Sequence, residues 1–226
     1  MKTVLYFIFG CSATGKSTRV YHLIQFLDSR SEKWEPLIAR GKVIGRHYVD
    51  RNLSIVGKEV VFKGIKKWQG LDIFTGVFGS NEVLFRWIYD HTRTSSLIIE
   101  GAGTILSHRA RPEVLEKELD PETSCQFLIY EFPNFSDYQK RIADRSGYDI
   151  SEDTPMWQKN RAMKGFGVKI IAEAKLTPTP SRYHLEMNSY DSDVKGLGRT
   201  VLGVNLEFEN FPVVFPKPLS EERNLF

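Results

Sequence analysis

The sequence predicts an α/β fold, a three-layer sandwich in which a mainly parallel central sheet lies between two layers of helices. The first observation is at the start of the chain, where an unbroken apolar run, Val4 to Phe9, leads through a glycine-bounded loop into an amphipathic helix. The second is that runs typical of buried strands alternate with helical patterns, as in parallel sheets covered on both faces. With 226 residues, 41% of them hydrophobic, the chain is expected to form a single domain, 1–226.

The first elements after the loop have clear patterns. Apolar residues recur at helical spacing in the first helix: Val20, Leu23, Ile24 and Leu27. Two extended segments, Lys42 to Tyr48 and Leu53 to Phe62, are separated by the polar turn Asp50-Arg51-Asn52. This arrangement predicts a β-hairpin.

The alternation continues through the middle of the chain. Ser80 or Asn81 is expected to cap a helix that has these residues on one face: Val83, Leu84, Trp87 and Ile88. Leu97 to Gly101 has the composition of a short buried strand ending in an acid, Glu100. A helix over about 112–119 and a buried strand over 127–130 follow.

Two helices and a strand complete the predicted elements. Ser136 and Gln139 form the pattern of a capping box at the start of one helix. Thr154-Pro155 opens another helix that runs towards Lys175, with weak positions at two glycines, Gly165 and Gly167. After a proline-rich break, the segment 182–187 alternates as a strand does. The C-terminal extension, about 196–226, contains short β-prone pieces separated by glycines, and its role stays open.

The loop from Gly10 to Ser17 has the complete sequence G-x-x-x-x-G-K-[ST]. In such loops the backbone N–H groups surround a phosphate chain, the lysine approaches the β and γ phosphates, and the hydroxyl binds Mg²⁺. The sequence therefore predicts bound ATP or GTP with Mg²⁺; a glycine turn that binds nothing is the alternative. The expected nucleotide contacts are Gly10, Ser12, Ala13, Thr14, Gly15, Lys16, Ser17 and Thr18.

Glu100 is expected to lie close to this loop, because ligands of parallel sheets sit beyond the carboxyl ends of the strands. We expect Ser17 and Glu100 to hold Mg²⁺ together. Motor ATPases usually end the corresponding strand with an Asp-Glu pair, whereas this strand ends Glu100-Gly101. The single acid favours a transferase over a hydrolase. The alternative is a strand-end carboxylate that accepts hydrogen bonds from a helix N-terminus.

Arg141 and Arg145 are four residues apart and share one face of their predicted helix. Two guanidinium groups so placed can bind one multiply charged phosphate, and phosphoryl transfer needs positive charge in a closed site. We therefore predict an arginine-bearing helical lid over about 137–165, to which Arg161 and Lys164 can add charge. A solvated basic face paired with Asp144 is the alternative.

The loop, the acid-ended strand and the arginine lid together resemble the nucleoside and nucleotide kinase branch of P-loop proteins, over roughly residues 1–175. Polynucleotide kinases and kinases encoded by bacteriophages are also similar. The resemblance implies an ATP-dependent phosphotransferase in which Lys16, Arg141 and Arg145 are catalytic. One departure is Ala13, where these kinases often have glycine. An alanine there is expected to fit with a negative φ.

In this branch of kinases the segment after the second strand, here a hairpin region of about 41–75, holds the acceptor and often supplies an Asp as general base. Asp72 is the residue that this implies, since it follows Gly70 and a carboxylate can take the proton of an acceptor hydroxyl. Asp50 and Glu100 are rival bases. A helix cap or turn is the alternative role of Asp72.

Trp68 is surrounded in sequence by Lys58, Lys63, Lys66 and Lys67. Basic residues interleaved with an aromatic are typical of sites for a stacked base and its phosphate backbone. A core tryptophan with solvated lysines is the alternative. The substrate residues expected are Lys67, Trp68 and Arg109, with Arg111 a further candidate. They favour an acceptor derived from nucleic acid, and the resemblance suggests a hydroxymethylated base in DNA such as 5-hydroxymethyluracil, or a nucleoside or nucleotide.

Bulk properties set few further limits. The formal net charge of +3 permits an anionic partner without requiring one. The first apolar run is too short to span a membrane, so we expect no membrane partner and a cytoplasmic setting, the host cytoplasm for a viral protein. Two cysteines, Cys11 and Cys125, favour a reducing compartment. A small-metabolite kinase and a non-catalytic nucleotide-binding module remain as alternatives, and the oligomeric state stays open.

Overall fold

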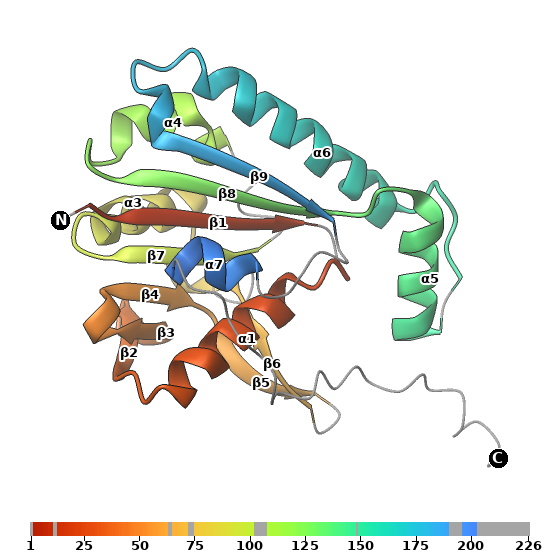
Figure 1. Ribbon diagram of the computed structural model, residues 1–226, viewed down its shortest axis with the longest axis horizontal. Helices are drawn as coiled ribbons and strands as arrows, with labels where there is room; N and C mark the ends of the chain where they lie inside the picture. Colours follow the sequence, from red (N-terminus) through yellow and green to blue (C-terminus); the bar gives the residue numbers. More distant parts are fainter. Residues whose placement is uncertain are drawn as a thin grey trace.

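A seven-stranded sheet forms the centre of the computed structural model (Figure 1). The structure describes residues 2–10, 13–62, 65–71, 75–101, 108–147, 149–189 and 196–202. Several residues singled out above lie outside that description: Cys11, Ser12, Lys63, Asp72, the side chains of Arg145 and Lys164, and the chain after Leu202.

The strands of the sheet follow the order β2-β3-β4-β7-β1-β8-β9. Their bounds are β1 (Val4–Gly10), β2 (Trp34–Ala39), β3 (Lys42–Tyr48), β4 (Leu53–Val56), β7 (Ser96–Glu100), β8 (Ser124–Glu131) and β9 (Tyr183–Ser189). The five strands from β4 to β9 run parallel to their neighbours, whereas β3 is antiparallel to both β2 and β4. The predicted α/β fold is thus confirmed as a mixed, mostly parallel sheet.

Helices cover both faces of this sheet (Figure 1). Among the described residues there are seven: α1 (Lys16–Ser29), α2 (Thr75–Phe78), α3 (Asn81–Thr92), α4 (Pro112–Glu118), α5 (Phe135–Ser146), α6 (Pro155–Ala174) and α7 (Gly196–Leu202). Residues of α3, α4 and α6 pack on one face of the sheet, and residues of α1 and α7 pack on the other. Helix α5 lies beyond the carboxyl end of the sheet (Figure 1).

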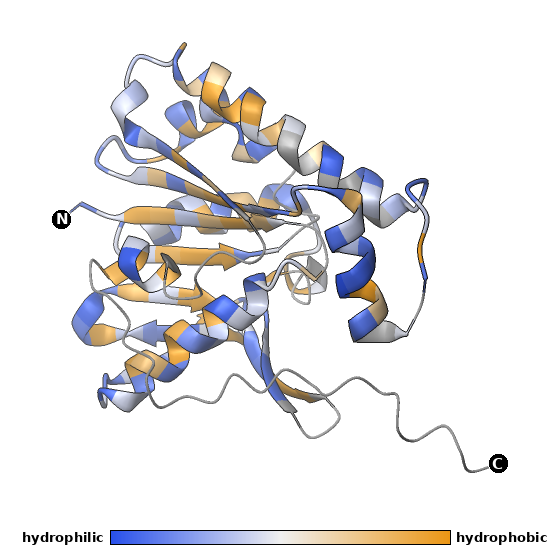
Figure 2. Ribbon diagram, turned by 45° about the vertical axis from the view of Figure 1, so that its right-hand side comes forward, coloured by the Kyte–Doolittle hydropathy of each residue, from blue (hydrophilic) through white to orange (hydrophobic). Residues whose placement is uncertain are grey.

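The core explains why the central strands are apolar throughout. Along β1, Phe7 and Phe9 belong to the cluster under α3 and α6, while Tyr6 and Ile8 belong to the cluster under α1. A strand buried on both faces has no solvent side and so cannot alternate. Figure 2 shows the same distribution, with hydrophobic residues concentrated on the strands and a mostly hydrophilic α5.

The predicted β-hairpin is confirmed for β3 and β4, which are joined by a 3-10 turn, η1 (Val49–Arg51). The predicted strand from Leu53 to Phe62 is wrong in its length, because it breaks at Gly57. Gly57 has a φ of 141°, and a Cβ there would collide with the Trp68 indole. Beyond this break, β5 (Lys58–Phe62) leaves the central sheet and pairs with β6 (Ile65–Gln69) as a separate two-stranded ribbon.

Three other local predictions need correction. Asn134, and not Ser136, caps α5: its Oδ1 accepts the Asp137 N–H at 2.9 Å and the Ser136 hydroxyl at 2.7 Å. Gln139 does not complete a capping box, because its amide donates to the Asp149 carboxylate and the Ile150 carbonyl. Residues 196–202, expected to be β-prone, form α7, which packs on α1 through Leu197.

Other predicted helix starts are confirmed. The Ser80 hydroxyl accepts the Val83 N–H at 3.3 Å at the start of α3. Helix α6 begins at Pro155 and continues through both of its glycines. Gly167 is needed for close packing, because a Cβ there would lie 2.9 Å from both Ile129 and Met187.

Candidate functional site

The two glycines that bound the loop adopt backbone conformations with positive φ angles. Gly10, the last residue of β1, has a φ of 148°, and a Cβ there would lie 2.5 Å from the Tyr130 carbonyl oxygen. Gly15 has a φ of 78°, and its Cβ would lie 2.6 Å from a guanidinium nitrogen of Arg19. Both conformations favour glycine. The spacing of the motif therefore has a structural cause at both ends of the loop.

Ala13 adopts a φ of 68°, so the expectation of a negative φ is wrong. A left-handed conformation costs a residue with a Cβ roughly 1–2 kcal/mol. In return, Ala13 packs against a cluster of buried residues, here called the aromatic cluster: Phe132, Tyr138, Ile142 and Trp157. The methyl group that makes the conformation costly is thus also the side chain that packs against the aromatic cluster.

Lys16, Ser17 and Glu100 come together where β1 and β7 end. Ile8 is the register partner of Glu100, so the strand-end acid lies beside the start of the loop. The Lys16 Nζ is 3.9 Å from one carboxylate oxygen of Glu100, and the Ser17 hydroxyl donates to the other at 3.3 Å. The side chains of Lys16 and Glu100 are only 8% and 7% exposed. The site therefore holds a buried carboxylate that contacts both a buried cation and a hydroxyl.

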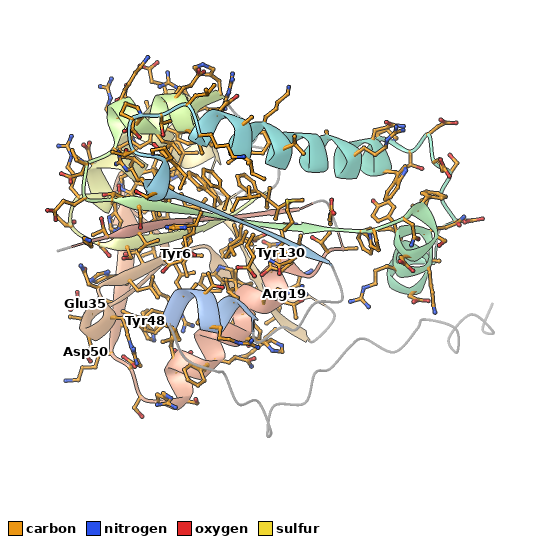
Figure 3. All side chains as sticks on the ribbon, turned by 45° about the horizontal axis from the view of Figure 1, so that its top comes forward. Tyr6, Arg19, Glu35, Tyr48, Asp50 and Tyr130 are labelled. Atoms are coloured by element: carbon orange, nitrogen blue, oxygen red, sulfur yellow. The ribbon has the colours of Figure 1, made fainter. Side chains whose placement is uncertain are left out.

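The ribbon returns to the central sheet directly at Glu100. A Cβ on Gly70 would collide with the Glu100 carbonyl and carboxylate, so only glycine allows this approach. Asp72 follows two residues later, outside the described residues. Asp50 lies elsewhere: it is exposed in η1, before β4 begins, at the opposite end of the parallel strands (Figure 3). This position removes Asp50 as a base for chemistry at Glu100.

The Arg19 side chain stabilises the glycine-bounded loop, a role that the sequence analysis missed. Its guanidinium donates to the Thr14 carbonyl at 2.9 Å and lies 4.4 Å from the centre of the Tyr130 ring (Figure 3). Burial raises the pKa of Tyr130 to about 12, so the ring is a neutral phenol beside this cation. An arginine on the buried side of an amphipathic helix, three residues after Lys16, was the available signal.

Helix α5 and the start of α6 form the predicted lid region. Tyr138 and Trp157 stack with ring centres 5.4 Å apart, and Tyr138 also contacts Phe132 edge to face at 5.0 Å. These contacts join α5, α6 and Phe132, the residue that follows β8, into one unit. Arg141 lies on α5, and Arg161 is exposed on α6.

Trp68 is only 1% exposed, and its Nε1 donates to the Val56 carbonyl at 3.2 Å. It belongs to the core under α1, which is the alternative considered above, and offers no open ring face for a base. Lys66 pairs with Glu59 at 3.0 Å, whereas Lys67 is half-buried on the other face of the ribbon.

Arg109 and Arg111 have different surroundings. The Arg109 guanidinium lies 3.8 Å from the Glu82 carboxylate and lines a hollow of about 440 Å³ between α3 and α4. Arg111 donates from Nε to both carboxylate oxygens of Glu173 at 3.0 Å, and so anchors α6 to the chain before α4. Both guanidinium groups thus have carboxylate partners, and their side chains are about equally exposed, at 37% and 36%.

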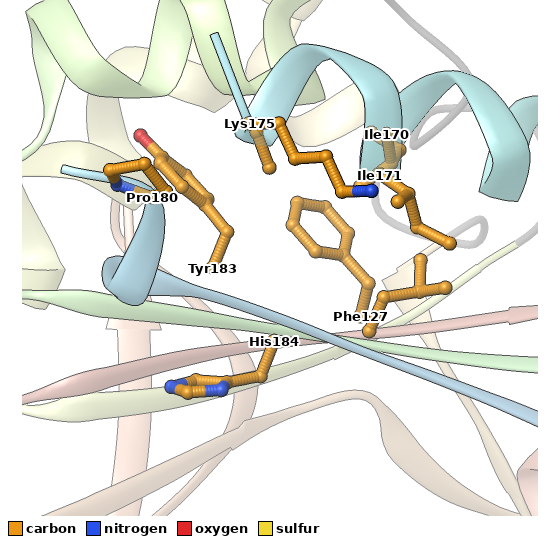
Figure 4. A pocket seen from close by; sticks show the side chains of 9 residues that line it. Phe127, Ile170, Ile171, Lys175, Pro180, Tyr183 and His184 are labelled. Carbon is orange, nitrogen blue, oxygen red and sulfur yellow. The ribbon is translucent and has the colours of Figure 1, made fainter. Parts of the chain in front are cut away.

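An apolar cavity of about 220 Å³ lies between α6 and β9 (Figure 4). Phe127, Ile170 and Tyr183 line it, and Lys175 contributes the cation at its rim. It shares no residue with the Lys16, Ser17 and Glu100 group. Burial raises the pKa of the nearby Cys125 thiol to about 12, which keeps that thiol protonated.

The described residues contain no group of three or more His, Cys, Asp or Glu that could by itself hold a metal ion. Nor does any described helix combine the length and apolarity needed to cross a membrane.

Comparison with known proteins gives the family. A family model described as 5-hmdU DNA kinase 2 matches residues 1–174, from the first strand to the last residue of α6. A curated relative, 5-hmdU DNA kinase 2 of Salmonella phage ViI, is 27% identical over 162 residues, which are 68% of this chain and 51% of the relative. The chain thus spans about half the length of that relative. On the strength of the family match over most of its length, the chain belongs to the 5-hmdU DNA kinase 2 family.

Proposed function

We propose that this protein is a P-loop kinase that transfers the γ-phosphate of ATP to the hydroxyl of 5-hydroxymethyluracil in DNA. Membership of the 5-hmdU DNA kinase 2 family carries the reaction and the acceptor. The observation that supports the position of the site is the contact of Lys16 and Ser17 with Glu100, at the carboxyl ends of two neighbouring parallel strands. Ligands of such sheets bind at this end.

The glycine-bounded loop is the proposed donor site, a Walker A loop in sequence. A kinase of this family implies a nucleotide phosphate donor. In the proposal, backbone N–H groups from Gly10 to Thr18 surround the β and γ phosphates, and the Lys16 ammonium neutralises charge that develops during transfer. Burial of Lys16 supports this role, because a charge excluded from water acts more strongly on its neighbours.

Ser17 and Glu100 would hold Mg²⁺. Their oxygen atoms lie 3.3 Å apart, and hydroxyl and carboxylate oxygens are the hard ligands that Mg²⁺ prefers. The remaining ligands would come from phosphate oxygens and water, as is usual for this ion. Bound there, Mg²⁺ would neutralise charge on the transferring phosphate.

Asp72 remains the proposed general base. Its support is the approach of Gly70 to Glu100, which brings the chain to the site two residues before Asp72. In the proposed step the Asp72 carboxylate accepts the hydroxyl proton while that oxygen bonds to the γ-phosphorus. The bond from the γ-phosphorus to the bridging oxygen breaks, ADP leaves, and Arg141 and Arg145 of the lid stabilise the transferring group.

The test is a transfer assay with γ-labelled ATP and a duplex oligonucleotide that contains one 5-hydroxymethyluracil. The expected result is label on that base after digestion to nucleosides, with none on a matched duplex containing thymine. Transfer only to a free nucleoside or a small metabolite would contradict the proposed acceptor. ATP binding without transfer to any acceptor would contradict a kinase and favour a nucleotide-binding module.

A further inference from the structure

The carboxyl edge of the sheet leads from the proposed site into the ribbon. Gly70 lies against Glu100, since a Cβ there would collide with the Glu100 carboxylate. Gln69, the preceding residue, is the register partner of Lys58 on the other strand of the ribbon. Paired residues of antiparallel strands lie about 5 Å apart, and adjacent residues along the chain about 3.8 Å apart. The backbone at Lys58 is therefore within about 15 Å of the backbone at Glu100.

The same edge continues to the turn between β2 and β3. Gly57, the last residue before the ribbon, donates its N–H to the Ile44 carbonyl of β3 at 2.8 Å. Strand β3 begins two residues earlier, at Lys42, and runs antiparallel to β4, so its first residue lies at the carboxyl end of the parallel strands. The turn before it, 40–41, has positive φ angles at both residues, 50° and 74°. Two-residue turns of this kind join antiparallel strands tightly, which fixes the backbone of Arg40 and Lys42 at this edge.

Three cations lie along this edge, here called the basic edge: Arg40, Lys42 and Lys58. All three residues are exposed. The Arg40 guanidinium donates to the Phe78 carbonyl at 3.0 Å, which holds it in place without neutralising its charge. Within the part of the chain that the structure describes, no carboxylate pairs with any of the three. Their combined positive charge is therefore available to an anion from outside.

Other cations of the same strands are paired with acids. Arg46 in the middle of β3 contacts the Asp28 carboxylate at 2.8 Å, and Arg51 in η1 contacts Glu32 at 2.7 Å. A cation beside a carboxylate contributes little to the field at a distance, whereas neighbouring unpaired cations add their fields and attract a polyanion. The carboxyl end of these strands thus offers an anion-binding surface that the middle of β3 lacks.

We propose that the basic edge binds the phosphate backbone of the substrate DNA on one side of the target base. This inference rests on the proposed function and names the surface that holds its substrate. Neighbouring strands are about 4.8 Å apart, so the three cations lie roughly 10 to 25 Å from Glu100. One strand of duplex DNA has a phosphate about every 3.4 Å of its axis, so the basic edge spans about the third to the seventh phosphate from the target base. Such contacts position the duplex and carry no sequence information.

The first test removes single charges. Lys42→Ser and Lys58→Ser should each weaken binding of a 5-hydroxymethyluracil duplex about fivefold at 0.15 M salt, and each should lower the slope of log Kd against log salt by about 0.9. KM for DNA should rise and KM for ATP should stay the same. Arg40 is left in place, because its bond to the Phe78 carbonyl also holds α2.

Lys33→Ser is the matched control, because Lys33 is an exposed lysine just before β2, at the opposite end of the same hairpin. It should change neither the affinity nor the slope. All three variants should keep the melting temperature of the parent, since each replaces an exposed side chain. An equal loss of affinity in the Lys33→Ser protein, or no loss in the other two, would overturn the inference.

The second test locates the contacts on the DNA. In a set of duplexes, one phosphate at a time is replaced by an uncharged methylphosphonate on either side of the target base. For the parent protein, replacement of a contacted phosphate, about the third to the seventh on one side, should weaken binding about fivefold. At one of these positions the Lys42→Ser protein should show no further loss, because the two changes remove the same contact.

Fully additive losses at every position would overturn the inference. Transfer of label to the 5-hydroxymethyluracil duplex by the parent protein would still support the proposed function in that case. Absence of this transfer would instead overturn the proposed function, whatever the affinities of the variants.

Discussion

The two ends of the central sheet bury different polar groups. At the carboxyl end the buried pair is charged, with the Lys16 ammonium 3.9 Å from the Glu100 carboxylate. At the amino end the buried Arg182 guanidinium donates to the backbone carbonyls of Thr123 and Asp120, and neutral hydroxyls lie beside it in close contact. Thr3 donates to the Thr92 carbonyl at 2.6 Å and lies 2.9 Å from the Thr123 hydroxyl.

A second group at the amino end repeats this pattern. The fully buried Ser54 hydroxyl lies 2.9 Å from His47 Nδ1 and 2.8 Å from His91 Nε2. Neutral networks of this kind stabilise a fold, because each buried polar group has a partner. Buried charges are costly to maintain. Backbone carbonyls accept the hydrogen bonds of Arg182, whereas Lys16 faces a carboxylate beside the glycine-bounded loop. We therefore expect substitutions at the carboxyl end to reduce activity, and those at the amino end to reduce stability.

The largest expected effect tests the carboxyl end. Lys16→Ala should lower kcat about 10³-fold, because it removes a charge that stabilises the transition state in a site closed to water. Initial rates of label transfer measure this loss. Lys16→Arg is the control for folding, since it keeps a cation beside Glu100 and should preserve the melting temperature. A Lys16→Ala variant with kcat within tenfold of the parent would contradict the comparison.

The substitution Gly70→Ala should change both activity and packing at the carboxyl end of the sheet. The new methyl group has no space against the Glu100 carbonyl and carboxylate, so the ribbon or Glu100 must move. We expect a loss of about 3 kcal/mol in the free energy of unfolding, together with reduced transfer. Urea unfolding measures the first change. Gly76→Ala, whose Cβ would meet nothing within 4 Å, is the matched control and should leave both quantities unchanged.

A pH series tests the amino end. Burial, with a smaller contribution from His47, lowers the pKa of His91 from 6.5 to about 4. Between these values the unfolded chain binds the proton and the folded protein does not. The stabilising contribution of neutral His91 is therefore complete above pH 6.5 and declines as the pH falls towards 4, by up to about 3 kcal/mol.

The measurement is the free energy of unfolding in urea at pH 7 and at pH 4.5. His91→Gln should make the difference between the two pH values smaller than in the parent. His184→Gln is the control, since His184 is exposed on β9, and it should leave the difference as it is. An unchanged difference in the His91→Gln protein would show that this network does not set the stability of the amino end.

The smallest expected effect concerns Ala13. Ala13→Gly relieves the φ of 68° but removes the methyl contact with the aromatic cluster. We expect kcat to fall a few-fold, while the free energy of unfolding changes by less than about 1 kcal/mol because the two effects offset each other. Ser31→Gly relieves a similar φ of 57° outside that cluster and should raise stability slightly with kcat unchanged. Equal kinetics for both variants would contradict a link between the loop and the aromatic cluster.

Much of the carboxyl end could be predicted from the sequence. The loop is a fixed spacing of glycines around a lysine, and its shape depends on local backbone freedom at Gly10 and Gly15. The position of Glu100 follows from a general rule, since parallel strands end at one edge of the sheet. Local patterns and one topological rule were therefore sufficient to bring Lys16 and Glu100 together.

The parts that escaped prediction depend on tertiary contacts. Strand β2 has only Leu37 and Ala39 buried and contains Pro36, which is typical of an edge strand and gives a weak pattern. The break of the predicted strand at Gly57 could not be predicted from the sequence, because the residues on both sides of it are β-prone. Trp68 was ambiguous for a related reason: its sequence neighbours are lysines, but its spatial neighbours are apolar residues beneath α1.

Helix α6 has a mechanical consequence for the whole molecule. Its second half is fixed on the sheet through Ile170 and Ala174, whereas Trp157 near its start belongs to the aromatic cluster. Gly167 follows Trp157 by ten residues along the helix, so the segment between them makes an arm about 15 Å long. Pivoting this arm by about 10° at Gly167 would swing Trp157 by about 2.6 Å, given the rise of about 1.5 Å per residue. A small rotation of the helix at Gly167 would therefore displace Trp157 by nearly the length of a hydrogen bond.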